Sequence, residues 1–219
     1  MAPQKKFAVV LSGNGVFDGS EIHEAVMTLY AINRNNGDYQ VFAPDMDQHH
    51  VLNHLTGEEM EEKRNVLVES ARIARGNAKA LSEYHVEDFD ALIIPGGFGA
   101  AKNLSSFAFD GTDCNVNPEM EAAIKETHKA GKPIGALCIA PVILARVLGD
   151  VVLTVGQDEA TTDALTKMGA RAVKTKAREI ASDPGNKIVT NPCYMLDSSL
   201  VDIAKGANRV VKAMIKMMD

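Results

Sequence analysis

Cys138 is the residue of this sequence best placed to carry out chemistry. It directly follows the short apolar run 133–137 and precedes a helix-like stretch over 139–148. A side chain at such a strand-to-helix junction lies at the carboxyl edge of a parallel sheet, where open α/β folds bind their ligands. Helix-terminal amides lower the pKa of a thiol, and the thiolate is the nucleophilic form. The alternative is a small buried hydrophobic side chain, because free cysteine often has that role.

Two further features favour a nucleophile at this position. The sequence PGGFG over 95–99 directly follows another apolar run, and its glycines would let backbone amides approach a ligand, as an oxyanion hole requires. Glu21 and Glu24 lie one helical turn apart where the first helix is predicted to begin. The alternative for the glycines is a flexible turn, and the alternative for the acids is a solvated pair that interacts with the helix dipole.

Two other patterns predict ligand sites less specifically. The loop 13–19 has the spacing GxGxxxG, one residue longer than the dinucleotide-binding fingerprint, with Asp45 as a candidate ribose ligand. His49, His50 and His54 lack cysteine or carboxylate partners at ligand spacing, so we expect a surface loop there and no metal. We expect no cofactor.

The elements that position these residues alternate along the chain between short apolar runs and stretches with helical period. This alternation predicts βαβ units on a mainly parallel sheet. Strands are predicted over 7–11, 39–44, 89–95, 133–137 and 151–155, with a short extra strand near Val51 and a hairpin over 179–190. Helices are predicted over 21–35, 63–74, 118–130, 139–148, 158–168 and 197–217. Ser20 is the expected N-cap of the first helix.

Composition limits the classes of partner. The net charge of -6 disfavours nucleic acid, whose affinity comes from clustered Lys and Arg. No apolar run approaches the roughly 20 residues of a membrane-spanning helix. Cys114, Cys138 and Cys193 show no CxxC spacing, so we expect free thiols in a reducing compartment. Because a strand begins at Phe7, we expect no leader, a cytoplasmic location, and one domain over 1–219.

Four stretches together resemble the PfpI/ThiJ superfamily of class I glutamine amidotransferase-like proteins, over essentially the whole chain. These are PGGFG at 95–99, GALCIAP at 135–141, LSGNGVFDGSEIHE at 11–24 and GFGAAKNL at 97–104. The last two stretches are similar to the ElbB branch, the enhancing lycopene biosynthesis proteins. The resemblance implies an α/β, flavodoxin-like three-layer sandwich with a mainly parallel sheet, a cysteine nucleophile elbow and a homodimer.

The resemblance also implies roles for individual residues. Cys138 would be the nucleophile and Glu24 the carboxyl group that meets it, while the amides of Gly97 and Ile139 would form the oxyanion hole. The neighbouring Gly96 belongs to the same loop. Glu21 and Asn14 are further candidates for the pocket.

The histidines separate this chain from amidotransferases of the same superfamily. All six precede Cys138, so a Cys-His-acid triad is not expected. A thiolate and a carboxyl group suit a small reactive carbonyl substrate, and we expect a glutathione-independent glyoxalase that converts 2-oxoaldehydes to 2-hydroxy acids. The alternative is a non-enzymatic redox sensor or partner-binding protein that uses Cys138 oxidation, with an accessory link to isoprenoid biosynthesis.

Overall fold

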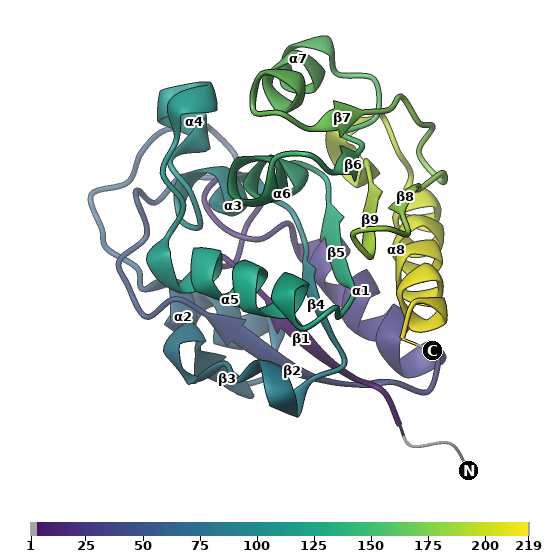
Figure 1. Ribbon diagram of the computed structural model, residues 1–219. Coiled ribbons are helices and arrows are strands. Elements are labelled where there is room, and N and C mark those ends of the chain that lie inside the picture. Colours follow the sequence, from purple (N-terminus) through teal and green to yellow (C-terminus); the bar gives the residue numbers. More distant parts are fainter. Residues whose placement is uncertain (1–3, 219) are drawn as a thin grey trace.

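A central sheet of seven strands organises the computed structural model, which describes residues 4–218 (Figure 1). Its strand order is β3-β2-β1-β4-β5-β9-β8. Neighbouring strands are parallel except for the hairpin pair β8 and β9, which is antiparallel. The strands are β1 (Lys6–Val10), β2 (Asp38–Ala43), β3 (Ala78–Ala80), β4 (Ala91–Ile94), β5 (Ile134–Leu137), β8 (Ala181–Asp183) and β9 (Ile188–Asn191). The sheet is therefore mainly parallel, as predicted.

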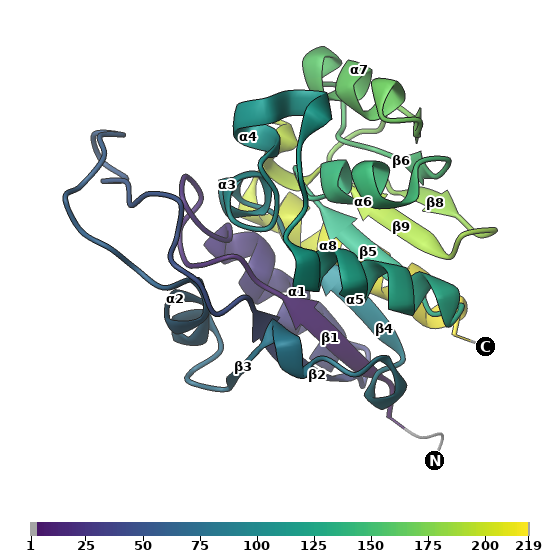
Figure 2. The ribbon, with the colours of Figure 1, turned by 60° about the vertical axis from the view of Figure 1, so that its left-hand side comes forward.

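Helices cover both faces of this sheet and complete three layers. In Figure 2, α1 and α8 lie on one face, and α5 and α6 lie on the other. The α-helices are α1 (Ile22–Arg34), α2 (Val66–Ile73), α3 (Phe98–Lys102), α4 (Phe107–Asp110), α5 (Pro118–Lys129), α6 (Pro141–Leu148), α7 (Glu159–Lys167) and α8 (Leu200–Lys216). None of the helices within 4–218 is long and apolar enough to cross a membrane.

The middle strands are apolar at consecutive positions because both of their faces are covered. In β1 the side chains from Phe7 to Val10 are fully buried, and all four residues of both β4 and β5 are buried. A strand with one face in water would alternate apolar and polar residues instead. Helix α8 presents its buried residues at helical spacing and begins with a capping box between Ser199 and Asp202. These patterns allow the central strands and α8 to be predicted from the sequence.

The structure differs from the predicted elements in several short segments. The stretch 151–155 contributes only β6 (Val152–Leu153), which pairs with β7 (Arg171–Ala172) in a separate two-stranded sheet. Strands β3 and β7 and helix α4 were not predicted, since each has four residues or fewer. Near Val51 there is no strand but an isolated bridge between Leu52 and Glu59.

The N-cap of α1 is Glu21, and the prediction of Ser20 was wrong. The Glu21 side chain accepts the Glu24 amide at 2.7 Å. Ser20 is fully buried, and its hydroxyl accepts the Ser12 amide at 2.8 Å instead. The expectation of no leader concerns in part residues 1–3, which lie outside the described residues.

Loops after β1 and β4 meet where the strand order changes direction. Beyond β1 the chain adds β2 and β3 on one side, whereas β4 and β5 lie on the other. The Glu21 amide donates to the Gly96 carbonyl at 2.8 Å, and the Phe98 amide donates to the Val16 carbonyl at 2.7 Å. Such a switch point at the carboxyl ends of parallel strands is where α/β sheets form ligand crevices.

Candidate active site

Cys138 occupies a sharp turn between β5 and α6. Its backbone φ is +59°, in the left-handed region that residues with a side chain seldom adopt. The Cys138 amide donates to the Asn191 carbonyl of the neighbouring β9 at 3.0 Å, and α6 begins three residues later at Pro141. Backbone strain of this kind costs on the order of 1–3 kcal/mol and clusters at functional sites. The turn gives Cys138 the geometry of a nucleophile elbow.

The Cys138 side chain is less accessible than its position at the sheet edge suggested. It is 7% exposed. The thiol is nevertheless not packed wholly among apolar groups, because the Glu24 carboxyl and the Gly97 and Ile139 amides lie close enough to affect its pKa. The structure thus brings together the four groups to which the sequence assigned chemistry.

Glu24 is fully buried in the first turn of α1, beside Cys138. One carboxyl oxygen, Oε2, accepts the Gly96 amide at 3.0 Å. The other, Oε1, accepts the Tyr194 amide at 3.2 Å. Among the described residues no Lys, Arg or His nitrogen lies within 4.0 Å of this carboxyl group. Two backbone amides therefore hold the Glu24 carboxyl in place, without a neutralising cation.

Burial dominates the proton affinity of both groups. It raises the pKa of Glu24 from 4.5 to about 8, with a further contribution from the Glu21 charge. Burial and then the Glu24 charge raise the pKa of Cys138 well above 9, against the opposing effect of the Gly97 and Ile139 amides. The expectation of a thiol pKa lowered by helix amides was wrong, because those amides are outweighed by desolvation and by a neighbouring acid.

Gly96 and Gly97 allow the loop after β4 to lie against the nucleophile. A Cβ atom added at Gly96 would stand 2.4 Å from the Cys138 Cβ and 2.7 Å from Glu24 Oε2. Gly97 has a φ of +99°, and a Cβ there would stand 2.3 Å from the Glu21 amide nitrogen. Neither position can hold a side chain without displacing the site.

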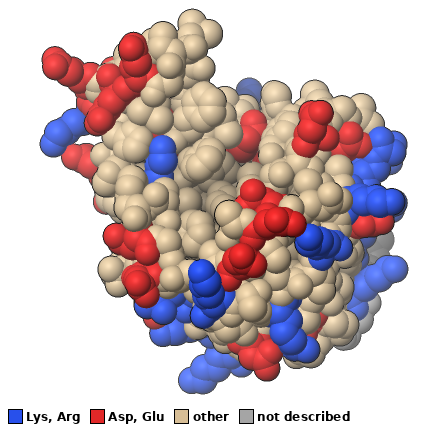
Figure 3. All heavy atoms as spheres, turned by 90° about the horizontal axis from the view of Figure 1, so that it is seen from above, with Lys and Arg blue, Asp and Glu red and all other residues tan. Residues whose placement is uncertain are grey.

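The thiol opens into a cavity of about 410 Å³. Apolar groups form most of its wall, and polar groups come from Asp158, Thr161 and Tyr194. Figure 3 shows this end of the molecule from above, hollowed near its centre, with uncharged residues on one side of the hollow and acidic residues on the other. The lining residues are Val16, Gly97, Phe98, Ala101, Phe107, Ala108, Cys138, Ile139, Asp158, Thr161, Tyr194 and Met195.

The two additional pocket candidates are placed differently. Glu21 is 8% exposed and caps α1 directly beside Glu24, so its charge acts on the pair while its carboxyl is bound to the helix. Asn14 does not line the Cys138 cavity but a separate hollow that also contains Asn65 and Arg72. The structure therefore connects Glu21 with the Cys138 pair and separates Asn14 from it.

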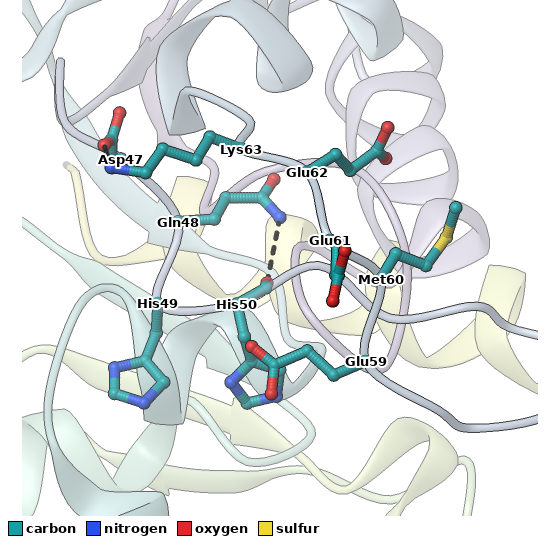
Figure 4. A pocket seen from close by; sticks show the side chains of 9 residues that line it. All are labelled: Asp47, Gln48, His49, His50, Glu59, Met60, Glu61, Glu62 and Lys63. Carbon is teal, nitrogen blue, oxygen red and sulfur yellow. Dashed lines mark hydrogen bonds and ion pairs between the residues drawn. The ribbon is translucent and has the colours of Figure 1, made fainter.

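The three neighbouring histidines do not converge on one point. The His49 ring stacks on Phe109 with centroids 4.0 Å apart, and the His54 Nε2 accepts the Phe17 amide at 3.2 Å. Figure 4 shows His49 and His50 at one end of a surface hollow that also contains Gln48, whose amide donates to the His50 carbonyl at 3.5 Å. Within 4–218 no three His, Cys, Asp or Glu side chains form a group that could hold a metal ion.

The glycine loop after β1 is closed by its own hydrogen bonds. The Gly15 amide donates to the Ser20 carbonyl at 2.9 Å, and the Gly19 amide donates to the Gly15 carbonyl at 2.7 Å. These amides would have to face a pyrophosphate in the dinucleotide-binding interpretation. Asp45, the candidate ribose ligand, accepts a hydrogen bond from Asn65 at 2.8 Å. The structure therefore favours a structural role for this loop.

Cys114 and Cys193 are buried outside the cavity lining. The Cys193 thiol donates to Asn191 Oδ1 at 3.1 Å. Next to it, Tyr194 is a site residue that sequence reasoning missed, since its amide holds Glu24 and the residue lines the cavity. The available signal was its place just beyond the carboxyl end of β9, beside the end of β5.

Comparisons with known proteins bear on the family and the fold of the chain. The DJ-1/PfpI family matches residues 15–190. The human "Glutamine amidotransferase-like class 1 domain-containing protein 3, mitochondrial" is 46% identical over 225 residues, covering 98% of this chain and 84% of that protein. The "ES1 protein homolog, mitochondrial" of Rattus norvegicus is 45% identical and covers 98% of this chain and 85% of that protein.

Solved structures show the same architecture. An isoprenoid biosynthesis protein with an amidotransferase-like domain from Ehrlichia chaffeensis has a TM-score of 0.90 and 38% identity, covering 96% of this chain and 99% of that one. Drosophila melanogaster DJ-1beta, at 15% identity, has a TM-score of 0.58 with coverage of 98% of this chain and 96% of that one. The predicted flavodoxin-like fold is confirmed, and the chain belongs to the DJ-1/PfpI family.

Proposed function

We propose that this protein is a glutathione-independent glyoxalase, which converts 2-oxoaldehydes such as methylglyoxal and glyoxal to 2-hydroxy acids. The observation that carries the proposal is the buried pair of Cys138 and Glu24, which lie together against Gly96 beside a cavity. A nucleophile next to a carboxyl group whose pKa is raised to about 8 is suited to addition followed by proton transfer.

The number of protons on Cys138 and Glu24 determines how the first bond forms. The pKa values of both groups lie above neutrality, so the pair holds two protons at pH 7 and loses the first near pH 8. The pair with one remaining proton is the reactive form. With that proton on Glu24, Cys138 Sγ attacks the aldehyde carbon as a thiolate. The aldehyde oxygen takes the proton from Glu24 and becomes the hydroxyl group of a hemithioacetal. Glu24 is then a carboxylate.

The second stage moves hydrogen between the two substrate carbons. The Glu24 carboxylate removes the proton from the carbon bound to sulfur, which gives an enediolate whose oxygen the Gly97 and Ile139 amides stabilise. Glu24 returns this proton to the neighbouring carbon, and the hydroxyl proton moves to the new alkoxide oxygen. The product is a thioester of the 2-hydroxy acid. Water cleaves the carbon–sulfur bond, releases the acid and restores the pair, so the net change is addition of one water molecule.

The histidine distribution argues against glutamine hydrolysis and proteolysis, although relatives carry amidotransferase-like names. Among the described residues that line the cavity there is no histidine. His23 is on α1, where its ring contacts the Tyr194 hydroxyl at 2.9 Å. A Cys-His-acid triad needs an imidazole bonded to the nucleophile, and Cys138 has a carboxyl group in that place.

A redox sensor is the competing function, and the same pair disfavours it. Peroxide reacts with thiolates, which are stabilised at sensor cysteines by a low pKa and by exposure. Cys138 is 7% exposed, and burial raises its pKa. The carbonyl chemistry needs the same thiolate, but it takes place in the cavity beside Cys138 and uses the Glu24 proton in each later step.

The deciding experiment measures lactate formed from methylglyoxal and resolves its two enantiomers. Enzymatic proton return at one face gives an excess of one enantiomer, whereas uncatalysed hydration and rearrangement give a racemate. We expect Cys138→Ser and Glu24→Gln each to lower kcat/KM by about 10²–10⁴. Cys114→Ser is the matched control, since that thiol is buried outside the cavity lining. Racemic lactate at the same rate from all variants would refute the proposal.

Assembly and location remain predictions. A homodimer is supported by apolar side chains left exposed on the neighbouring helices α1 and α8, namely Ile22, Val26, Tyr30, Leu200 and Val201. Light scattering should then give about twice the chain mass of 23.5 kDa. The printed names of the human and rat relatives describe those proteins as mitochondrial, so localisation of this chain needs imaging of a tagged protein against the expected cytoplasmic location.

A further inference from the structure

A second hollow, of about 510 Å³, adjoins the Cys138 cavity. Phe98 and Ala108 line both hollows. In the loop after β1, Val16 lines the first and its neighbour Phe17 lines the second. The two hollows therefore meet along three segments of chain. A ligand that reached both hollows would pass Phe98.

The second hollow contains an ammonium group, that of Lys102. Its Nζ donates to the Phe17 carbonyl at 2.7 Å and to His50 Nε2 at 3.1 Å. It also lies 5.4 Å from the centre of the Phe98 ring. An ammonium group has three N–H donors, so these two bonds leave one for a ligand.

The protein does not neutralise this charge at close range. Within the described part of the chain no carboxylate oxygen lies within 4.0 Å of Lys102 Nζ. Burial lowers the pKa of Lys102, and the Asp18 charge opposes this from further away. The Asp18 Oδ2 accepts the Leu52 amide at 2.7 Å. Both direct acceptors of Lys102 are neutral, because a ring nitrogen that accepts from an ammonium group carries no proton. The hollow thus contains a positive charge with one N–H donor that can bind a ligand.

We propose that Lys102 binds an anionic group of the substrate, so that the favoured substrates are 2-oxoaldehydes whose far end is a carboxylate or a phosphate. This inference rests on the proposed function, and it names the substrate class of the same site. The reactive aldehyde would lie at Cys138, and the chain between the two ends would cross the Phe98 ring, which is 48% exposed.

Helix geometry sets the length of such a substrate. The oxyanion amide of Gly97 precedes α3, and Lys102 is the last residue of that helix. At 1.5 Å of rise per residue, five residues separate them by about 7 Å along the axis. The Lys102 side chain turns back toward the start of the helix, because its Nζ lies 5.4 Å from the centre of the Phe98 ring. A linker shorter than the backbone separation, of about two carbons, is therefore tested first. The volume agrees, since cavities of about 410 and 510 Å³ are in the range of about 300–1,000 Å³ typical of larger ligands and exceed the need of a three-carbon dicarbonyl.

The test compares two substrates of equal chain length, 4,5-dioxovalerate with its carboxylate and the neutral 2-oxopentanal. The measured quantity is the ratio of their kcat/KM values, which does not depend on the fraction of enzyme that is folded. We expect Lys102→Met to lower the ratio of anionic to neutral substrate by about tenfold or more, because a charge-assisted hydrogen bond is lost. Lys102→Arg should retain the ratio.

The matched control is Lys63→Met, which removes a charge from an exposed lysine that pairs with Asp47 at 3.6 Å and does not line this hollow. We expect it to leave the ratio unchanged. A ratio that is the same in the native protein and in Lys102→Met would overturn the inference while the proposed function stands.

A binding measurement separates the two proposals if neither substrate is turned over. Titration calorimetry with the products 2-hydroxyglutarate and 2-hydroxypentanoate does not require catalysis. Tighter binding of 2-hydroxyglutarate that is lost in Lys102→Met would support the anion site even though the glyoxalase proposal had failed. Equal binding of the two acids would reject the anion site.

Discussion

The buried carboxyl of Glu24 should make the stability of the protein depend on pH in an unusual direction. Its pKa is raised from 4.5 to about 8 on folding. Between these values the folded chain keeps a proton that the unfolded chain has released, so the free energy of unfolding falls as pH rises. At 1.36 kcal/mol per pKa unit, the shift corresponds to about 5 kcal/mol, fully present below pH 4.5 and lost by about pH 8.

Glu24→Gln removes this titration and keeps a side chain of nearly the same shape. Glutamine does not ionise, so its free energy of unfolding lacks the fall with pH. In urea unfolding from pH 5 to pH 8, we expect the variant to gain stability relative to the native protein by about 1.4 kcal/mol per pH unit. Glu83→Gln is the control, because Glu83 is exposed on the surface. The difference in the free energy of unfolding between this variant and the native protein should not change with pH.

One outcome would refute the reasoning. If the stability difference between Glu24→Gln and the native protein were constant from pH 5 to pH 8, the carboxyl group would ionise with the same affinity in both states. Glu24 would then carry no proton at neutral pH, and the shared-proton mechanism would lose its acid.

Three further predictions follow from the same contacts. The kcat/KM for methylglyoxal should rise with pH around an apparent pKa of about 8, because the Cys138–Glu24 pair must lose one proton, and a pH–rate profile of Glu24→Gln should lack that step. Gly96→Ala should lower turnover by about 100-fold or more, since its Cβ would stand 2.4 Å from the Cys138 Cβ, and full activity in steady-state assays would contradict the close packing. Ser199→Ala should remove the capping box of α8 and lower the urea-derived stability by about 1 kcal/mol without changing turnover per folded molecule.

The fold was largely predictable because its central strands and long helices show regular spacing of apolar residues. Strands β1, β4 and β5 are continuous apolar runs, and α8 has an apolar face at helical spacing. Strands β3 and β7 and helix α4 carry too few residues for a period to be measured. Their formation depends on neighbours that are distant in the sequence, such as β2 for β3.

The candidate site was predictable in its positions and not in its electrostatics. Cys138 after a strand, Glu24 at a helix start and a glycine pair after another strand are local patterns. The proton affinities depend on what covers these groups, including the amide of Tyr194, which the chain reaches only after β9. The role of Lys102 is not predictable from the motif at 97–104 in which it lies, because its contacts with Phe17 and His50 exist only in the fold.

The burial of the Glu24 carboxyl without a cation is difficult to explain as a contribution to stability. A buried carboxyl without a cation is destabilising once it ionises, and the pKa of about 8 means that the protein avoids this cost near neutral pH only by keeping the proton. Glutamine could accept one of the two backbone hydrogen bonds at this position with no such cost. Glu24 destabilises the folded protein at the pH where it ionises, and it lies beside a strained cysteine and a cavity. A role in proton transfer explains this placement better. For that reason Glu24→Gln should be more stable and less active at pH 8, whereas a purely structural carboxyl would lose stability and leave turnover unchanged.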